Sequence, residues 1–188
     1  MEKAEIGLIG LGTMGSNLAL NIAEKGHRIA VFNRTVARVD DFKANADDLA
    51  GRIVLSDREA SVRTRARELD LGHEVAESAA EAVAGADHVI LCVPVGACGA
   101  VAAEIAAALK PGAILSDVGS VKGSVVDAVL PHLPEGVAFV PAHPVAGTGN
   151  SGPAAGFPSL FLNRWCLLTP PAGADVAASR KTRHFWVG

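Results

Sequence analysis

The sequence has no tyrosine, and aromatic residues make up only 4% of its 188 residues. A core with so few aromatics must be built from Ala, Val, Ile and Leu, and such a core suits a parallel sheet covered by helices. Basic residues are not in excess either, since 17 Lys and Arg stand against 20 Asp and Glu. This balance argues against a nucleic-acid partner, which needs positive charge to bind phosphates. A hydrophobic fraction of 49% argues against disorder.

Long apolar runs are also missing. No stretch approaches the ~20 apolar residues of a membrane span, and the apolar run near the N-terminus breaks at glycines too soon for a signal peptide. Cys92, Cys98 and Cys166 are odd in number and lack C-x-x-C spacing, which argues against a disulfide framework or a metal site. We expect small buried thiols, no metal, no membrane partner and a cytoplasmic location.

Strand-like and helix-like segments alternate along the chain, as is typical of right-handed βαβ units. The sequence predicts an α/β fold, in which residues 1–188 form a single three-layer Rossmann-type domain with a doubly wound, mostly parallel sheet. The expected strands are 5–10, 28–32, 52–55, 87–93, 113–117, 137–140 and 165–168. The expected helices are 14–25, 36–50, 58–71, 78–84, 97–109, 123–130 and 174–186.

The first half of the chain holds more strand candidates than a plain dinucleotide fold needs, since about three are usual there. Residues 5–93 contain at least four, and Val75–Glu77 is a possible fifth. Either one candidate is a loop or the chain carries an extra βα unit.

A glycine-rich turn follows the first expected strand and matches G-x-G-x-x-G. Gly10 permits the tight turn, Gly12 lets a pyrophosphate approach the backbone, and Gly15 lets helix and strand pack closely. With Thr13 and Met14, these residues open a helix whose N-terminus favours anions. The turn therefore predicts dinucleotide binding, and a structural turn without a ligand is the alternative.

The end of the second expected strand, Asn33-Arg34-Thr35, carries no carboxylate for the ribose hydroxyl of NAD. Arg34 can pair with a 2′-phosphate and stack on adenine, which favours NADP and leaves NAD possible. The alternative is an exposed surface arginine. Asp57 is a rival ribose ligand, but it lies too far along the chain for the usual spacing.

Two resemblances meet in this chain. Residues 5–35, with the glycine turn and Asn33-Arg34-Thr35, resemble the start of 6-phosphogluconate dehydrogenase, and its NADP preference implies that Asn33, Arg34 and Thr35 hold the 2′-phosphate. From about residue 56 the chain resembles the prephenate/arogenate dehydrogenases of tyrosine synthesis. That second resemblance rests on Leu91-Cys92-Val93-Pro94-Val95, on Ser116-Asp117-Val118-Gly119-Ser120-Val121-Lys122 and on Ala142-His143-Pro144-Val145-Ala146-Gly147-Thr148. Together they predict an engineered or recombined chimera with a splice near 45–57, which also accounts for the surplus strand.

The second resemblance implies a chemistry. In that family, the His of H-P-x-A-G engages the ring hydroxyl of the substrate while hydride passes to the nicotinamide and the carboxylate is lost. His143 matches this position, and histidine suits proton transfer near neutral pH. Ser120 matches the Ser that orients the His and contacts substrate, and Val93-Pro94 matches the turn under the nicotinamide. The implied substrate is prephenate or arogenate, and Lys122 is either a substrate-facing cation or a solvated lysine at a helix start.

Two departures from the family bear on activity. Gly149 stands where an acidic residue is common, and the chain ends before the helical domain that forms the family's dimer and supplies cations for the substrate. We therefore expect an NADP(H)-binding domain with little or no turnover of its own, with exposed apolar surface at Phe185 and Trp186, and with His88 as a surface or cap residue. An active NAD(P)-dependent dehydrogenase and an engineered scaffold without a ligand are the alternatives.

Overall fold

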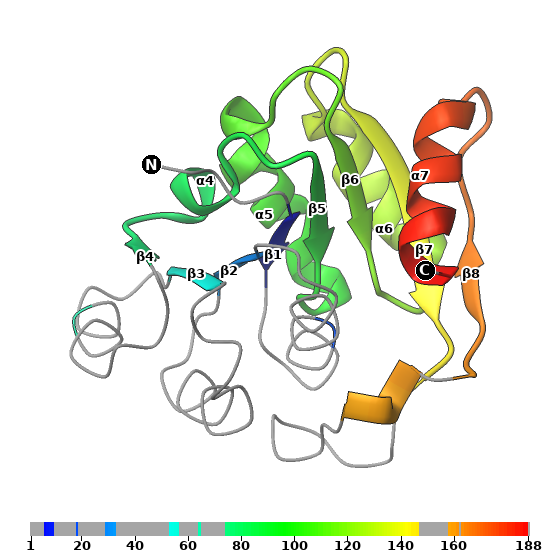
Figure 1. Cartoon of the computed structure of the whole chain (residues 1–188). Helices are drawn as coiled ribbons and strands as arrows, with labels where there is room; N and C mark the ends of the chain where they lie inside the picture. The colour runs from blue at the N-terminus through cyan, green and yellow to red at the C-terminus, as the bar shows by residue number, and fades with distance from the viewer. Residues whose placement is uncertain are drawn as a thin grey trace.

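The computed structural model of the chain describes residues 6–9, 18, 29–32, 53–56, 64, 74–146, 158–161 and 163–187. Within them, an eight-stranded sheet has the order β4-β3-β2-β1-β5-β6-β7-β8 (Figure 1). The strands are β1 (Ile6–Ile9), β2 (Ile29–Phe32), β3 (Ile53–Ser56), β4 (Glu74–Ala76), β5 (His88–Leu91), β6 (Ile114–Asp117), β7 (Ala138–Pro144) and β8 (Cys166–Leu168).

The sheet is wound in two directions from β1. The chain moves outward through β2, β3 and β4, then returns to the other side of β1 as β5 and continues outward through β6 and β7. Every pair from β4 to β7 is parallel, and only the β7–β8 pair is antiparallel. This confirms the predicted doubly wound, mostly parallel Rossmann-type sheet.

The surplus strand is an added unit and not a loop. Both β3 and β4 join the sheet, with Leu55 paired to Val75 in a parallel register. The open question in the sequence is thus answered by an extra strand at the β4 edge, and the candidate at Val75–Glu77 is confirmed one residue earlier, at Glu74–Ala76.

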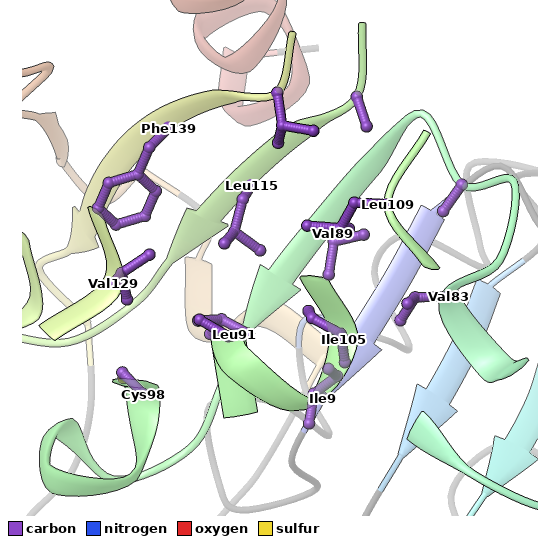
Figure 2. Packing of buried hydrophobic residues seen from close by; sticks show 14 of the residues in the cluster. Ile9, Val83, Val89, Leu91, Cys98, Ile105, Leu109, Leu115, Val129 and Phe139 are labelled. Atoms are coloured by element: carbon purple, nitrogen blue, oxygen red, sulfur yellow. The ribbon is translucent and has the colours of Figure 1, made fainter. Parts of the chain in front are cut away.

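One face of the sheet is covered by α4 (Ala79–Val83), α5 (Cys98–Ile105) and α6 (Lys122–Val129), which enclose the main apolar core. Figure 2 shows alternate residues of neighbouring strands, Leu91, Leu115 and Phe139 among them, pointing into this core. The helices α5 and α6 approach closely at Gly99, where a Cβ atom would lie 2.9 Å from the Ala128 carbonyl oxygen. This core is aliphatic, as the composition predicts.

The expected helix 97–109 is shorter in the structure than in the sequence pattern. The helix α5 covers only Cys98–Ile105 and is flanked by 3-10 turns at Val95–Ala97 and Ala106–Ala108. The expected strand 137–140 is longer, because β7 continues to Pro144. Its last three residues pair with β8 and therefore stay extended beyond the parallel part of the sheet.

The opposite face of the sheet carries α7 (Val176–Val187), which lies on the other side of the strands from α5 and α6 (Figure 1). Asp175 caps this helix, since its Oδ1 accepts hydrogen bonds from the amides of Ala177 at 2.6 Å and Ala178 at 3.2 Å. Ala178 packs on Ile114 and Val140. The three-layer prediction is therefore confirmed for the β5–β8 half of the sheet.

Two expectations about α7 and its surroundings are wrong. Phe185 and Trp186 are half-buried, and His88 is only 8% exposed. The Phe185 ring lies 5.3 Å from the His88 ring, and the Trp186 ring meets Phe161 edge-on at 6.0 Å. The reason is tertiary: α7 folds back over the sheet and brings its last turn against the first residue of β5.

Burial of His88 makes stability depend on pH. Burial lowers the pKa of its imidazole from 6.5 to about 4, and its Nε2 atom has no hydrogen-bond partner among the described residues. Because the unfolded state binds the proton first, the full contribution of neutral His88 is present above pH 6.5 and is lost as the pH falls towards 4. We expect the free energy of unfolding to fall by up to about 3 kcal/mol over this window, at about 1.4 kcal/mol per pKa unit.

Urea unfolding of the wild type and of His88→Leu between pH 7 and 4 checks this expectation. The variant should lose much less stability on acidification, because leucine fills the same apolar site without titrating. Parallel pH profiles for the two proteins would contradict the assignment.

Candidate functional site

The predicted site residues that the structure describes gather at one edge of the sheet. The strands β5, β6 and β7 are neighbours, with Leu91 paired to Asp117 and Asp117 paired to Pro141. Val93-Pro94 follows the end of β5, Ser120 follows the end of β6, and His143 lies in the last part of β7. Open α/β sheets bind their ligands at this carboxyl edge, beside the point where the strand order reverses, which here lies between β1 and β5.

The other predicted cofactor residues lie outside the described part of the chain. These are Gly10, Gly12, Thr13, Met14, Gly15, Asn33, Arg34 and Thr35, and Asp57 and Thr148 lie outside it as well. What the structure does describe is the strand before each of the two segments. Ile9 and Phe32, the last residues of β1 and β2, are paired with each other, and Ile9 is also paired with Leu91 of β5.

A buried ion pair lies at the centre of the edge formed by β5, β6 and β7. Asp117, the last residue of β6, is fully buried. Its Oδ2 accepts a hydrogen bond from the Gly119 amide at 2.8 Å and forms an ion pair with the Lys122 ammonium group. Lys122 Nζ also donates to the Ala142 carbonyl oxygen of β7 at 2.7 Å. One charged network therefore joins β6, the first residue of α6 and β7.

The network binds the backbone at the residue immediately before each predicted catalytic residue. Gly119 precedes Ser120, and Ala142 precedes His143. Gly119 leaves room for the carboxylate, since a Cβ atom there would lie 3.0 Å from Asp117 Oδ2. The network thereby fixes the turn that bears Ser120 against the strand that bears His143.

One of the two expectations for Lys122 is wrong. Its side chain is only 15% exposed, so it is not a solvated helix-start lysine. Its ammonium group is bound to Asp117 and Ala142, and the substrate-facing alternative stays a prediction. The sequence analysis gave Asp117 no role of its own, although a carboxylate at a strand end with a lysine five residues later is a usable signal.

His143 and Ser120 both lie on the side of the sheet that α6 covers. Phe139, Pro141 and His143 alternate along β7 and so share one face, which is the face packed on α6 at Phe139. Ser120 is exposed in the turn that leads into α6. No hydrogen bond joins Ser120 to His143 among the described residues, so the orienting role of Ser120 stays a prediction.

The three cysteines are free thiols. Burial raises the pKa of Cys98 to about 11 and that of Cys166 to about 12, and it raises the pKa of Cys92 as well. The negative charge of Asp117 acts in the same direction on all three. They are therefore neutral and weakly nucleophilic. Cys98 is buried as predicted, while Cys92 and Cys166 are half-buried. Among the described residues, no three His, Cys, Asp or Glu side chains are grouped so as to hold a metal.

Comparison with known proteins identifies the family of this chain. The nucleotide-binding domain of prephenate dehydrogenase matches residues 44–188. The chain belongs to this family. A second family profile, of shikimate/quinate 5-dehydrogenase, matches residues 1–71. The predicted family is thus confirmed, over a range that begins somewhat earlier than residue 56.

Relatives and solved structures agree with this assignment. The chain is 40% identical over 181 residues to cyclohexadienyl dehydrogenase of Zymomonas mobilis, covering 96% of this chain and 54% of that protein. A short N-terminal stretch of 43 residues is 63% identical to 6-phosphogluconate dehydrogenase of Trypanosoma brucei brucei, covering 22% of this chain and 9% of that protein. The predicted N-terminal resemblance is therefore also confirmed.

Two dehydrogenase crystal structures share the fold. Prephenate dehydrogenase from A. aeolicus, in complex with hydroxyphenyl propionate and NAD+, has a TM-score of 0.70 and 23% identity, covering all of this chain and 57% of that one. Synechocystis arogenate dehydrogenase has a TM-score of 0.69 and 24% identity, covering 96% of this chain and 55% of that one. The chain thus spans about half the length of these proteins and of its Zymomonas relative. No helix of the described residues is long and apolar enough to cross a membrane.

The ion pair predicts a large asymmetry between two lysine substitutions. Lys122→Met leaves the carboxylate of Asp117 buried without a partner, and we expect it to lower the free energy of unfolding by about 3 kcal/mol. Lys110→Met breaks an ion pair with Asp87 whose side chains are 39% and 75% exposed, and it should cost at most about 1 kcal/mol.

Urea unfolding of both variants measures this difference. The double variant Asp117→Asn/Lys122→Met should be less destabilised than the sum of its two single changes, because it removes both charges together. Equal effects of Lys122→Met and Lys110→Met would contradict the role given to the buried pair.

Proposed function

We propose that this domain binds NADP(H) and forms the cofactor half of a prephenate/arogenate dehydrogenase, which performs an oxidative decarboxylation in tyrosine biosynthesis. One observation carries the proposal. Val93-Pro94, Ser120 and His143 lie at the ends of three adjacent strands, beside the point between β1 and β5 where the strand order reverses. The match to the prephenate dehydrogenase nucleotide-binding domain supports it, as does the NAD+ in the A. aeolicus structure.

The residues at this edge suit a dinucleotide. The turn after β5 is apolar and Pro94 is exposed, which suits contact with a flat nicotinamide. When bound, the cofactor supplies the hydride acceptor. His143 accepts the proton of the substrate's ring hydroxyl while that oxygen becomes a carbonyl oxygen, and returns it to the oxygen when loss of the carboxylate as CO2 makes the ring aromatic. Ser120 orients the ring beside it.

The cofactor preference is a separate part of the proposal. Arg34 pairs with the 2′-phosphate of NADP, because the strand end Asn33-Arg34-Thr35 offers no carboxylate to a ribose hydroxyl. A charge-assisted contact of this kind contributes about 2 kcal/mol. NADPH should therefore bind at least about tenfold more tightly than NADH, and Arg34→Gln should remove this difference while leaving NADH affinity nearly unchanged.

Calorimetric or fluorescence titration with both cofactors measures the preference. Arg180→Gln, on the exposed side of α7, is the matched control and should change neither affinity. Tighter binding of NADH would refute the role of Arg34. The absence of saturable binding by either cofactor would favour the second candidate function, a scaffold that holds no ligand.

We further propose that a polypeptide of these 188 residues turns over little or no substrate. Lys122, the lysine two residues after Ser120, is already bound to Asp117 and Ala142, which leaves fewer of its hydrogen-bond donors for substrate carboxylates. Reduction of NADP+ with prephenate or arogenate should be very slow or undetectable. A measurable rate that His143→Ala abolishes would establish the alternative, an active NAD(P)-dependent dehydrogenase, and would also show which of the two substrates is preferred.

The splice near 45–57 and the cytoplasmic location stay predictions. The short 6-phosphogluconate dehydrogenase match supports two joined segments, whereas the match to the Zymomonas dehydrogenase runs over 181 residues and so crosses this interval. Three free thiols are consistent with a reducing compartment.

A further inference from the structure

The outermost strand of the sheet turns its large apolar side chains to solvent. Along β8 and the residue before it, the half-buried Cys166 and Leu168 alternate with the exposed Trp165 and Leu167. The first two face α7, which contacts β8, while Trp165 is 80% exposed and Leu167 is 51% exposed. The outer face of an edge strand is normally polar, so exposed Trp and Leu at these positions indicate a surface that binds something.

These side chains lie beside His143. Leu167 is the direct antiparallel partner of His143, so the two side chains point to the same face with Cβ atoms about 5 Å apart. The next pair on that face is Val145 with Trp165, joined by a hydrogen bond of 2.7 Å from the Val145 amide to the Trp165 carbonyl oxygen. Val145 is 48% exposed. Leu167, Val145 and Trp165 thus form a continuous surface next to His143, which we call the apolar rim.

The face is the same one that carries Ser120. His143 lies on the α6 side of β7, and Ser120 lies two residues before α6. The helix α6 packs on β7, and the side chains of the apolar rim beyond it are exposed.

Resting on the function proposed above, we propose that the apolar rim is the wall against which the six-membered ring of the substrate packs while its hydroxyl meets His143. Leu167 sets the position of the ring opposite the histidine, and the indole of Trp165 covers its outer edge by stacking. Neither residue takes part in the chemistry. They are specificity-determining residues for a ring-bearing substrate.

The size of the apolar rim favours a small ring over a protein partner. A stable protein interface buries about 800 Å² on each side, and three side chains supply only part of such an area. A single six-membered ring needs no more than one leucine, one valine and one indole face, and here those groups directly adjoin the residue that would accept its proton.

Binding of 3-(4-hydroxyphenyl)propionate to the 188-residue chain saturated with NADP+ tests the proposal. Calorimetry measures the affinity, and the fluorescence of Trp165, one of two tryptophans, reports on the apolar rim itself. Leu167→Ser and Trp165→Ser should each weaken binding by about tenfold or more, as expected for the loss of an apolar contact with a ring. Leu130→Ser is the matched control, because Leu130 is 42% exposed but lies after α6, at the opposite end of that helix from Ser120. It should leave the affinity unchanged, and circular dichroism confirms that each variant is folded.

Weaker binding in the two variants of the apolar rim, with Leu130→Ser unaffected, supports the proposal. It is overturned if the probe does not bind, if it binds all four proteins equally, or if Trp165→Ser changes only self-association in sedimentation, which would indicate a second copy of the chain on this surface. NADP+ affinity, measured in the same samples without the probe, reports separately on the cofactor site. Normal NADP+ binding together with equal probe binding by all four proteins therefore overturns this proposal alone and leaves the proposed function intact.

Discussion

The buried pair of Asp117 and Lys122 is the interaction on which the arrangement of the carboxyl edge depends. The backbone hydrogen bonds between parallel strands hold neighbouring segments only within the paired residues, and β6 ends at Asp117. Beyond that residue, the Asp117 carboxylate holds the Gly119 amide, and Lys122 spans from it to the Ala142 carbonyl of β7. A buried charge without its partner is strongly unfavourable, so the two halves of the network keep each other in place. The relative position of Ser120 and His143 therefore depends on the Asp117–Lys122 network.

The antiparallel strand β8 adds a second constraint. A strand that stopped at Val140 would leave the H-P-x-A-G segment as a loop, whereas pairing with β8 keeps residues 142–144 extended. His143 therefore sits on a regular strand held from both sides, by Lys122 at the preceding carbonyl and by Leu167 across the ladder. Sites on regular elements are positioned more rigidly than sites on loops, which suits the proton-accepting role proposed for His143.

The sequence predicts what depends on local pattern and misses what depends on tertiary contact. Alternating segments predict the sheet, and motifs at strand ends predict that Val93, Ser120 and His143 share an edge, because parallel strands bring their ends together. The state of Lys122 could not be predicted, since its partner Ala142 lies twenty residues away on another strand. The burial of His88 was likewise hidden, because the covering Phe185 belongs to the last helix. The strand β4 remained ambiguous because three residues give too short a pattern to separate from a loop.

Both faces of the sheet bury polar side chains. The α4–α6 face is aliphatic around Leu115 and Val125 but buries Asp117 at its carboxyl edge, and the α7 face buries Ser116, Thr182 and His88. Ser116 donates to the Val140 carbonyl at 2.7 Å, but Thr182 Oγ1, His88 Nε2 and, on the other face, Asp117 Oδ1 have no hydrogen-bond partner among the described residues. Buried polar atoms without partners lower stability, so both layers of helices carry such a cost. His88 begins β5 at the amino end, three residues before the carboxyl edge is reached at Leu91. Protonation of His88 therefore weakens the packing of α7, at the end of the sheet opposite the Asp117–Lys122 pair.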